Sequence, residues 1–527
     1  MSHRLTKLVQ GSAARTAHHA VNLAALFFLT PFVVASLGDR LYGLWIVAAS
    51  LTGYFFLLDF GITAAIGRFI GQGVGQDDTR RVNAIVSNGL LLMSIMGAIV
   101  LALTAVIIGF LPHFVAPDIV GMTGFLILLI GLELAFSFPL RTYDALLSAN
   151  LEHYIPSAVG VLTTLVRTIL IVVVLKAGYG ILALGIVNFG ANLAAHLSLY
   201  LIVRIRYPWV RAQRACLSTA TIKQLFNFSK YVFAAQAANL LRFRIDAFVI
   251  AAFLGLPMVT LYAIAAKLAE QFKTLMIQMT GVLGPLFFQY EGERNYDAIR
   301  SRFLSGCRVS LVVSSFIGAN LIILGRFFIQ NWMGPAYAAS YGVLAILAAG
   351  LLIALSQSIG IGVLLSLNQH KLFAITNGVE AVANLLLTLL LVKPLGILGV
   401  ALGTAIPMTI VKLAVQPLVI CRQLGLAFSC YSRQLLLPMG VLALFYGANY
   451  ALLHKVLAPS HMSYLQMAGW LTGELVLYIP FAFFLVLNDE ERGILRLLLH
   501  RIIKRIRFAS VKEHGLAYSR GPAGTRL

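Results

Sequence analysis

The chain has few charged residues for its length. Only 11% of its 527 residues are Asp, Glu, Lys or Arg, whereas 60% are hydrophobic. Soluble domains carry about 25% charged residues. A chain this apolar cannot cover its surface in water, which excludes an ordinary soluble protein and predicts an integral membrane protein.

Cysteines and nucleotide motifs are also scarce. The four cysteines, Cys216, Cys307, Cys421 and Cys430, have no paired spacing typical of a zinc site or a disulfide framework. The G-x-x-x-x-G-K-[ST] phosphate loop is missing, so the chain is not an ATP-driven pump in itself. We therefore expect no metal and no cofactor, apart from a possible coupling ion, Na⁺ or H⁺.

Long apolar runs are abundant instead. Runs of about 20 residues cross the hydrocarbon core as helices, because lipid leaves backbone groups no other partner. The sequence predicts an all-α integral membrane protein with about 14 transmembrane helices. Their expected ranges are 16–37, 41–65, 84–111, 119–140, 155–176, 179–203, 227–253, 257–287, 305–329, 340–367, 372–392, 396–420, 433–454 and 463–487.

The basic residues indicate the orientation. With the N-terminus inside, most of the 40 Lys and Arg fall in segments on the inner side, as cytoplasmic loops require. We expect a multi-pass protein of the bacterial cytoplasmic (inner) membrane with both termini cytoplasmic. The net charge of +21 is then a matter of topology, so we expect no nucleic-acid partner.

A short phrase occurs twice. "LLSAN" at Leu146 and "LLSLN" at Leu364 each close a predicted helix at the inner face, and "GIL" recurs at Gly180 and Gly396. "FVVASLG" from Phe32 pairs with "FVIAAFLG" from Phe248 with one gap. The repeat predicts two six-helix lobes related by a pseudo-two-fold axis along the membrane normal, with a substrate site at their interface.

The repeat sets the expected domain organisation. It comprises a cytoplasmic N-terminus (1–15), an N-lobe (16–203), a cytoplasmic linker (204–226), a C-lobe (227–421), an extra helix pair (433–487) and a basic tail (488–527). The tail segment Arg492–Arg507 is basic and amphipathic, so we expect it to lie on anionic membrane lipids.

A family resemblance follows from two stretches. "LGDRLYGLWIVAASLTGYFFLLDFGITAAIGRFIG" (Leu37 to Gly71) and "FRIDAFVIAAFLGLPMVTLYAIAAKL" (Phe243 to Leu268) resemble polysaccharide transporters of the multidrug/oligosaccharidyl-lipid/polysaccharide (MOP) exporter superfamily. The resemblance implies two bundles around a cavity that opens alternately to each face. It implies an oligosaccharide on undecaprenyl pyrophosphate as cargo, a monomeric transport unit, and a polysaccharide polymerase and glycosyltransferases as partners. The extra helix pair is similar to one that forms a lipid-tail groove in lipid II flippases.

Ionisable and amide side chains within spans are costly, so each is a candidate for function. They form stripes at helical spacing, and an arginine suits a phosphate because its fork binds two oxygens. The expected cavity residues are Arg15, His18, His19, Asn22, Asn188, Asn192, His196, Asn239, Arg242, Arg244, Asp246, Lys267, Glu270, Asn377 and Glu380. The alternative is interhelical bonding, such as a local pair between Arg242 and Asp246.

Two rival functions remain open. A cation-coupled multidrug exporter of the same superfamily would need a small aromatic pocket with an acidic cation site. A membrane glycosyltransferase or polymerase would need a sizeable outer loop for its catalytic residues, whereas the predicted outer loops are short. The two resembling stretches favour a polysaccharide flippase that works by alternating access.

Overall fold

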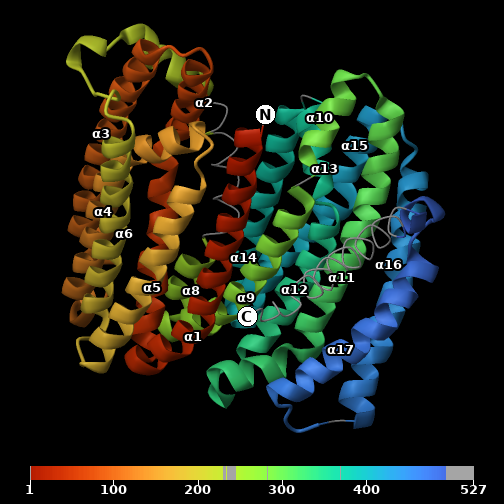
Figure 1. The fold of residues 1–527 in the computed structure, drawn as a ribbon. Helices are drawn as coiled ribbons and strands as arrows, with labels where there is room; N and C mark the ends of the chain where they lie inside the picture. The colour runs from red at the N-terminus through yellow and green to blue at the C-terminus, as the bar shows by residue number, and fades with distance from the viewer. Residues whose placement is uncertain are drawn as a thin grey trace, which may run out of the picture. The chain divides into compact units, whose positions relative to one another are not determined.

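The computed structural model describes residues 2–229, 233, 245–281, 283–367, 369–457, 459–493 and 496. Within these residues every regular element is a helix, which confirms the all-α fold (Figure 1). Nine helices are long and apolar enough to cross a membrane, or ten if one bent pair forms a single span. The predicted count of fourteen stays a prediction. Two of the long helices, α1 (Ser2–Phe55) and α14 (His370–Ile410), each contain a turn at a glycine.

The first half of the chain forms a helical bundle whose members run side by side in Figure 1. Its long helices are α1 (Ser2–Phe55), α3 (Thr79–Phe110), α4 (Pro117–Ala149), α5 (Tyr154–Lys176) and α6 (Gly180–Arg206). Exposed apolar side chains such as Leu162, Leu165 and Ile169 line one face of α5, as expected of a lipid-facing surface. The opposite faces of these helices pack inward.

The second predicted helix, expected at 41–65, is broken. Its first part ends with α1 at Phe55, a 3₁₀ turn, η1 (Phe56–Asp59), follows, and α2 begins only at Ile62 (Ile62–Gly75). The backbone at Phe60 and Gly61 is left-handed, with φ of 47° and 75°, which interrupts the helix. The buried carboxylate of Asp59 accepts bonds from the Thr63 amide (3.0 Å) and hydroxyl (2.9 Å), which satisfies one free donor of the new helix.

The linker after α6 lies along the first turns of α3. Asn83 donates to the Trp209 carbonyl at 3.1 Å and accepts from the Arg211 amide at 3.0 Å. Asn88 likewise bonds Cys216 and Ser218. The linker is therefore fixed to the first bundle over these residues.

The second half repeats the elements of the first. It contains α8 (Asp246–Leu254), α9 (Leu256–Gly281), α10 (Gly284–Gly292), α11 (Tyr296–Met333), α12 (Ser340–Ser356), α13 (Ile359–Ser366), α14 (His370–Ile410), the π-helix η5 (Val411–Val415) and α15 (Gln416–Leu424). Gly38 and Gly255, matched by the sequence repeat, have nearly the same φ/ψ, 74°/165° and 88°/168°. Gly180 and Gly396 both have positive φ, 67° and 57°. The backbone thus confirms the repeat at two of its turns.

The twice-written phrase is a helix terminator. The Glu152 amide bonds the Leu147 carbonyl at 2.9 Å, and the Gln369 amide bonds the Leu364 carbonyl at 2.8 Å. Each bond joins an amide to the carbonyl five residues earlier. This is the bond that closes a Schellman motif at the C-terminus of a helix. Leu151, next to Glu152, has the positive φ (60°) that this motif requires.

The chain forms two compact units that cut across the repeat. The first comprises residues 1–271, 328–350 and 371–411, and the second 272–327, 351–370 and 412–527. The predicted lobe boundaries stay a prediction. The second unit also holds the last helices, α16 (Phe428–Ala451) with η6 (Leu452–Leu457), and α17 (Tyr464–Phe481) with η7 (Ala482–Val486).

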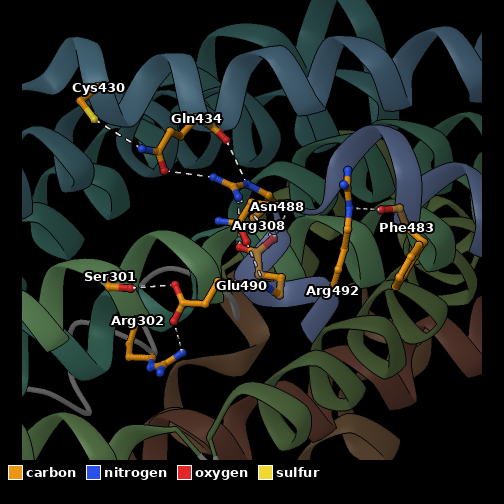
Figure 2. Close-up of polar contacts among 10 residues, drawn as sticks. Ser301, Arg302, Arg308, Cys430, Gln434, Phe483, Asn488, Glu490 and Arg492 are labelled. Carbon is orange, nitrogen blue, oxygen red and sulfur yellow. Dashed lines mark hydrogen bonds and ion pairs between the residues drawn. The ribbon is translucent and has the colours of Figure 1, made fainter. Parts of the chain in front are cut away.

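A buried ion pair holds the end of this last helix pair. Arg308 of α11 bonds Glu491 at 3.1 Å and the Gln434 amide oxygen of α16 at 3.0 Å, and its side chain is 7% exposed (Figure 2). Arg302 bonds Glu490 at 3.0 Å. The segment after η7 is thus tied to two helices. Most of the predicted tail helix (Arg492–Arg507) lies outside the described residues. The candidate residues Asn239, Arg242 and Arg244 lie outside them as well.

Candidate functional site

Helices α1 and α5 of the first unit pack in parallel with constant register. Gly11 lies against His153, the His18 ring lies over Gly160, and Thr164 donates to the Asn22 amide oxygen at 2.9 Å. The offset is 142 residues at each contact. At 1.5 Å per residue, Arg167 is therefore about 15 Å further along the bundle than Arg15.

Three arginines and three histidines follow this bundle from an exposed end, at Arg15, to half-buried positions further along. We call Arg15, His18, His19, Arg141, Arg167 and His196 the basic cluster; they come from α1, α4, α5 and α6. His18 and Arg167 interact electrostatically, as do Arg141 and His196. Arg15 lies at the loop between α4 and α5, where burial and then the Arg15 charge lower the pKa of His153.

Arg141 and Arg167 are half-buried, and carboxylates act on them only electrostatically, without a direct ion pair among the described residues. Within the described part of the chain neither guanidinium forms an ion pair. Arg141 lies over the ring of Phe56 at 3.9 Å, beside the break in the second predicted helix. A charged guanidinium that is kept in a membrane span without a direct ion pair is a candidate to bind an anion during function.

Glu133 is an acid that acts on both of these arginines. It interacts electrostatically with Arg141 and Arg167, and its Oε1 accepts a bond from the Asn192 amide at 2.9 Å. The predicted stripe Asn188, Asn192 and His196 is thus divided. Asn188 donates to the Leu184 carbonyl of its own helix, Asn192 faces Glu133, and His196 Nδ1 is buried without a hydrogen-bond partner among the described residues.

Sequence reasoning did not place Glu133, Arg141 or Arg167 among the candidates. Arg141 was assigned to a loop because the apolar run ends at Leu140, but α4 continues to Ala149. Arg167 lies near the middle of α5, flanked by apolar residues that face outward. A single arginine in an otherwise apolar span was the available signal for it.

An acidic, oxygen-rich cluster lies elsewhere in the first unit. Asp246, at the start of α8, accepts bonds from the hydroxyls of Tyr262 on α9 and Thr404 on α14. The Asn384 amide donates to Thr404 at 3.1 Å, and Glu380 is buried one turn before Asn384. We call these residues, with Asn377 and Thr388, the acidic cluster.

The acidic cluster has unused acceptors. Asp246 Oδ1, Asn384 Oδ1 and Thr388 Oγ1 are buried, and none has a hydrogen-bond partner among the described residues. Carboxylate, amide and hydroxyl oxygens are the ligands of hard cations. The same carboxylates can instead take up a proton. Asp246 does have described partners in Tyr262 and Thr404, whereas its proposed pairing with Arg242 lies outside the described residues.

The other candidates lie apart from both clusters. The Lys267 ammonium bonds the Tyr42 hydroxyl and, at 3.2 Å, the Thr30 hydroxyl, so it joins α9 to both limbs of α1. Glu270 is exposed. Near the Gly38 turn, Asp39 accepts a bond from the Tyr337 hydroxyl at 2.7 Å, and its carbonyl accepts one from Thr260 at 2.7 Å. These bonds tie the two repeats together at the Gly38 end.

Comparison with known proteins identifies the class of this fold. An inward-facing multidrug resistance MATE family transporter of the MOP superfamily superposes with a TM-score of 0.68 at 11% identity, over 79% of this chain and 98% of that one. The lipid II flippase MurJ in its inward closed conformation gives 0.63 at 15% identity, over 89% and 98%. The chain is therefore a multi-pass membrane protein with the MOP superfamily fold.

The family is shown by sequence. A family model described as "Polysaccharide biosynthesis protein" matches residues 9–291, more than half of the chain, and the chain belongs to this family. The uncharacterized membrane protein EpsK of Bacillus subtilis (strain 168) is 24% identical over 495 residues, 91% of this chain and 94% of EpsK. The uncharacterized membrane protein MJ1068 of Methanocaldococcus jannaschii is 23% identical over 209 residues, 39% of this chain and 41% of MJ1068.

Proposed function

We propose that the protein is a flippase that moves an oligosaccharide linked to undecaprenyl pyrophosphate across the bacterial inner membrane. The observation that carries this proposal is the pair of half-buried arginines, Arg141 and Arg167, which have no ion pair within the described residues. A diphosphate is the part of such a cargo that cannot enter lipid uncompensated. Arginine stays charged there and binds phosphate oxygens in pairs.

The arginines lie at different positions along the bundle, which suits a path for the cargo rather than one fixed binding site. Arg15 lies at the α4–α5 loop and Arg167 about 15 Å further along the bundle. A diphosphate that enters from the N-terminal end, which we place in the cytoplasm, would meet Arg15 first and Arg167 later. Asn192 and the histidines of the basic cluster would offer hydrogen bonds to phosphate or sugar oxygens.

The acidic cluster is our candidate for the coupling ion. Its buried carboxylates, Asp246 and Glu380, and its unused oxygens would take Na⁺ or H⁺. Alternating access also requires the bonds at the Gly38 end, from Tyr337 and Thr260 to Asp39, to break and reform. We expect a monomeric unit that receives cargo from glycosyltransferases and delivers it to a polymerase.

A cation-coupled multidrug exporter is the second candidate, because MATE transporters share the fold. The acidic cluster would suit a cationic drug. The basic cluster favours an anionic cargo, because a cationic drug gains nothing from three arginines. The family description, polysaccharide biosynthesis, supports the same choice.

Anion binding tests the proposal directly. The full-length protein in nanodiscs is titrated with farnesyl pyrophosphate, a short polyprenyl diphosphate. Arg167→Ala should weaken binding at least tenfold and abolish polysaccharide export in a host without its own flippase, whereas Arg167→Lys should restore both in part. Lys176→Ala removes the same charge from the exposed last turn of α5 and should change neither. Equal binding by Arg167→Ala and the wild type would overturn the proposal.

The coupling ion has a separate test. In proteoliposomes, Asp246→Asn should remove the dependence of transport on a sodium or proton gradient, since it removes the buried negative charge. Asp118→Asn, at an exposed ion pair with Arg40, is the matched control. Gradient-driven transport that persists in Asp246→Asn would place the ion elsewhere.

A further inference from the structure

Glu133 occupies an unusual place in the basic cluster. Arg141 is two turns from it on α4, and Arg167 reaches it from α5; both guanidiniums interact with the carboxylate electrostatically. Among the described residues no ion pair within 4.0 Å joins Glu133 to either arginine, and its Oε1 accepts a hydrogen bond from Asn192. The carboxylate therefore lies within the electrostatic influence of two cations without a direct ion pair to either among the described residues.

Among the described residues, Glu133 is the acid that acts on both arginines. Helix α6 brings His196 and α1 brings His18, which interact with Arg141 and Arg167 respectively. Asp59 and Asp144 act on Arg141 but not on Arg167. The charged residues of α2 and α3 are Arg68, which lies over Phe228, and Arg80 and Arg81 in the first turn of α3.

An anion that binds Arg141 and Arg167 comes close to the Glu133 carboxylate, and both negative charges are then attracted to the same two arginines. Two like charges in a partly buried site repel each other strongly, because the surrounding dielectric is low. The repulsion is relieved when one of them takes up a proton. Asn192 can keep its bond to the protonated acid, because the carbonyl oxygen of a carboxylic acid still accepts.

We infer that Glu133 is a competing carboxylate: it occupies the field of Arg141 and Arg167 when the cargo is absent, and it takes up a proton when the cargo diphosphate binds. This inference rests on the proposed function. The ionised form weakens binding and favours release, and the neutral form allows binding. Glu133 thus acts on the cargo through the arginines as a positioning residue, and it links cargo binding to the proton concentration.

The chain contains a matched control for this acid. Glu474 on α17 is buried, whereas Glu133 is half-buried; it also accepts an Asn amide, from Asn320 at 2.9 Å, but no arginine within the described part of the chain acts on it. Glu133→Gln and Glu474→Gln therefore make the same chemical change to the same kind of bond. They differ in the presence of the two arginines.

The test measures farnesyl pyrophosphate affinity and proton uptake together, with the full-length protein in nanodiscs at several pH values and in weak buffer. Glu133→Gln should bind about tenfold more tightly than the wild type at mildly alkaline pH, and should take up as much as one proton fewer per ligand. Glu474→Gln should behave as the wild type. The histidines of the basic cluster can also take up protons. The inference is therefore judged by the difference in affinity and proton uptake between the variants, and not by the pH dependence of the wild type alone.

The outcomes separate this inference from the proposed function. If the wild type binds through Arg167 but Glu133→Gln changes neither affinity nor proton uptake, the inference about Glu133 is overturned and the function survives. If the wild type binds no farnesyl pyrophosphate at any pH, the proposed function fails and this inference with it. Glu133→Ala, which also removes the charge, gives a second reading should the glutamine variant fold poorly.

Discussion

The two repeats carry opposite chemistry at related positions. Arg167 on α5 and Asn384 on α14 are 217 residues apart, the offset that also relates Gly38 to Gly255. In the first repeat this position belongs to the basic cluster, and in the second to the acidic cluster. The comparison teaches that the two repeats share their turns but differ in their interior charges, which is what our proposal of an anion in one repeat and a cation in the other requires.

Replacing Arg167 by the residue at the related position of the second repeat should have the largest effect on function. Arg167→Asn gives the first repeat the residue of the second, and we expect polysaccharide export to fall by about a hundredfold or more, because the proposed charge-assisted phosphate contact would be lost from a half-buried site. Export is measured in a host without its own flippase, with the variant's membrane level as the control. Normal export by Arg167→Asn would show that the difference between the repeats has no functional meaning.

The conserved turns give the next largest effect. Gly38 and Gly255 occupy a φ/ψ region that is almost restricted to glycine; a Cβ at Gly38 would meet nothing within 4 Å, and one at Gly255 would make only an ordinary contact with Pro257 at 3.9 Å. Gly38→Ala and Gly255→Ala should therefore each cost about 2 kcal/mol of stability from the backbone alone. Thermal unfolding in detergent should show similar shifts for both variants. A large shift for one variant and none for the other would contradict the equivalence of the turns.

Sequence alone predicted the all-α membrane fold and the repeat, because both follow from apolar length and from internal comparison. It did not predict the break at Phe56–Gly61, since the run there remains apolar and the interruption depends on the backbone of Phe60 and Gly61. It also missed Glu133 and Arg141. In a membrane span, hydropathy marks where the apolar run ends, whereas a helix can continue past that point, as α4 does to Ala149.

Each repeat also joins the loop after its fourth helix to the end of its sixth. In the first, Arg206 bonds Glu152 through Nη2 at 2.9 Å and Nε at 3.2 Å; in the second, 217 residues later, Gln369 bonds Gln423 at 3.3 Å. Glu152 is 1% exposed. Burial and then a hydrogen bond to Glu152 raise the pKa of Tyr207 to about 12, so this hydroxyl keeps its proton near the carboxylate.

Replacing the charged pair Arg206–Glu152 by the neutral glutamine pair of the second repeat should have a smaller effect, on stability. Arg206→Gln should cost about 2 kcal/mol, because it leaves Glu152 buried without its cation. Glu152→Gln should cost less, since Arg206 is half exposed and can be solvated. The double variant reproduces the pair of the second repeat and should recover most of the loss. Thermal unfolding of the four proteins measures the coupling, and additive losses would show that the two side chains do not depend on each other.

The reverse exchange should have the smallest effect. Gln369→Glu with Gln423→Arg installs the charged pair in the second repeat, where the existing amide bond is exposed. Exposed ion pairs contribute about 0–1 kcal/mol, because water solvates both charges and holding two long side chains costs entropy. We therefore expect a gain in stability below about 1 kcal/mol, and less still at high salt, where the remaining attraction is screened. Gln369→Glu alone, which adds an exposed acid without its partner, is the control and should be close to neutral. A gain as large as the loss in Arg206→Gln would mean that burial of Glu152 does not explain why the first repeat uses charges.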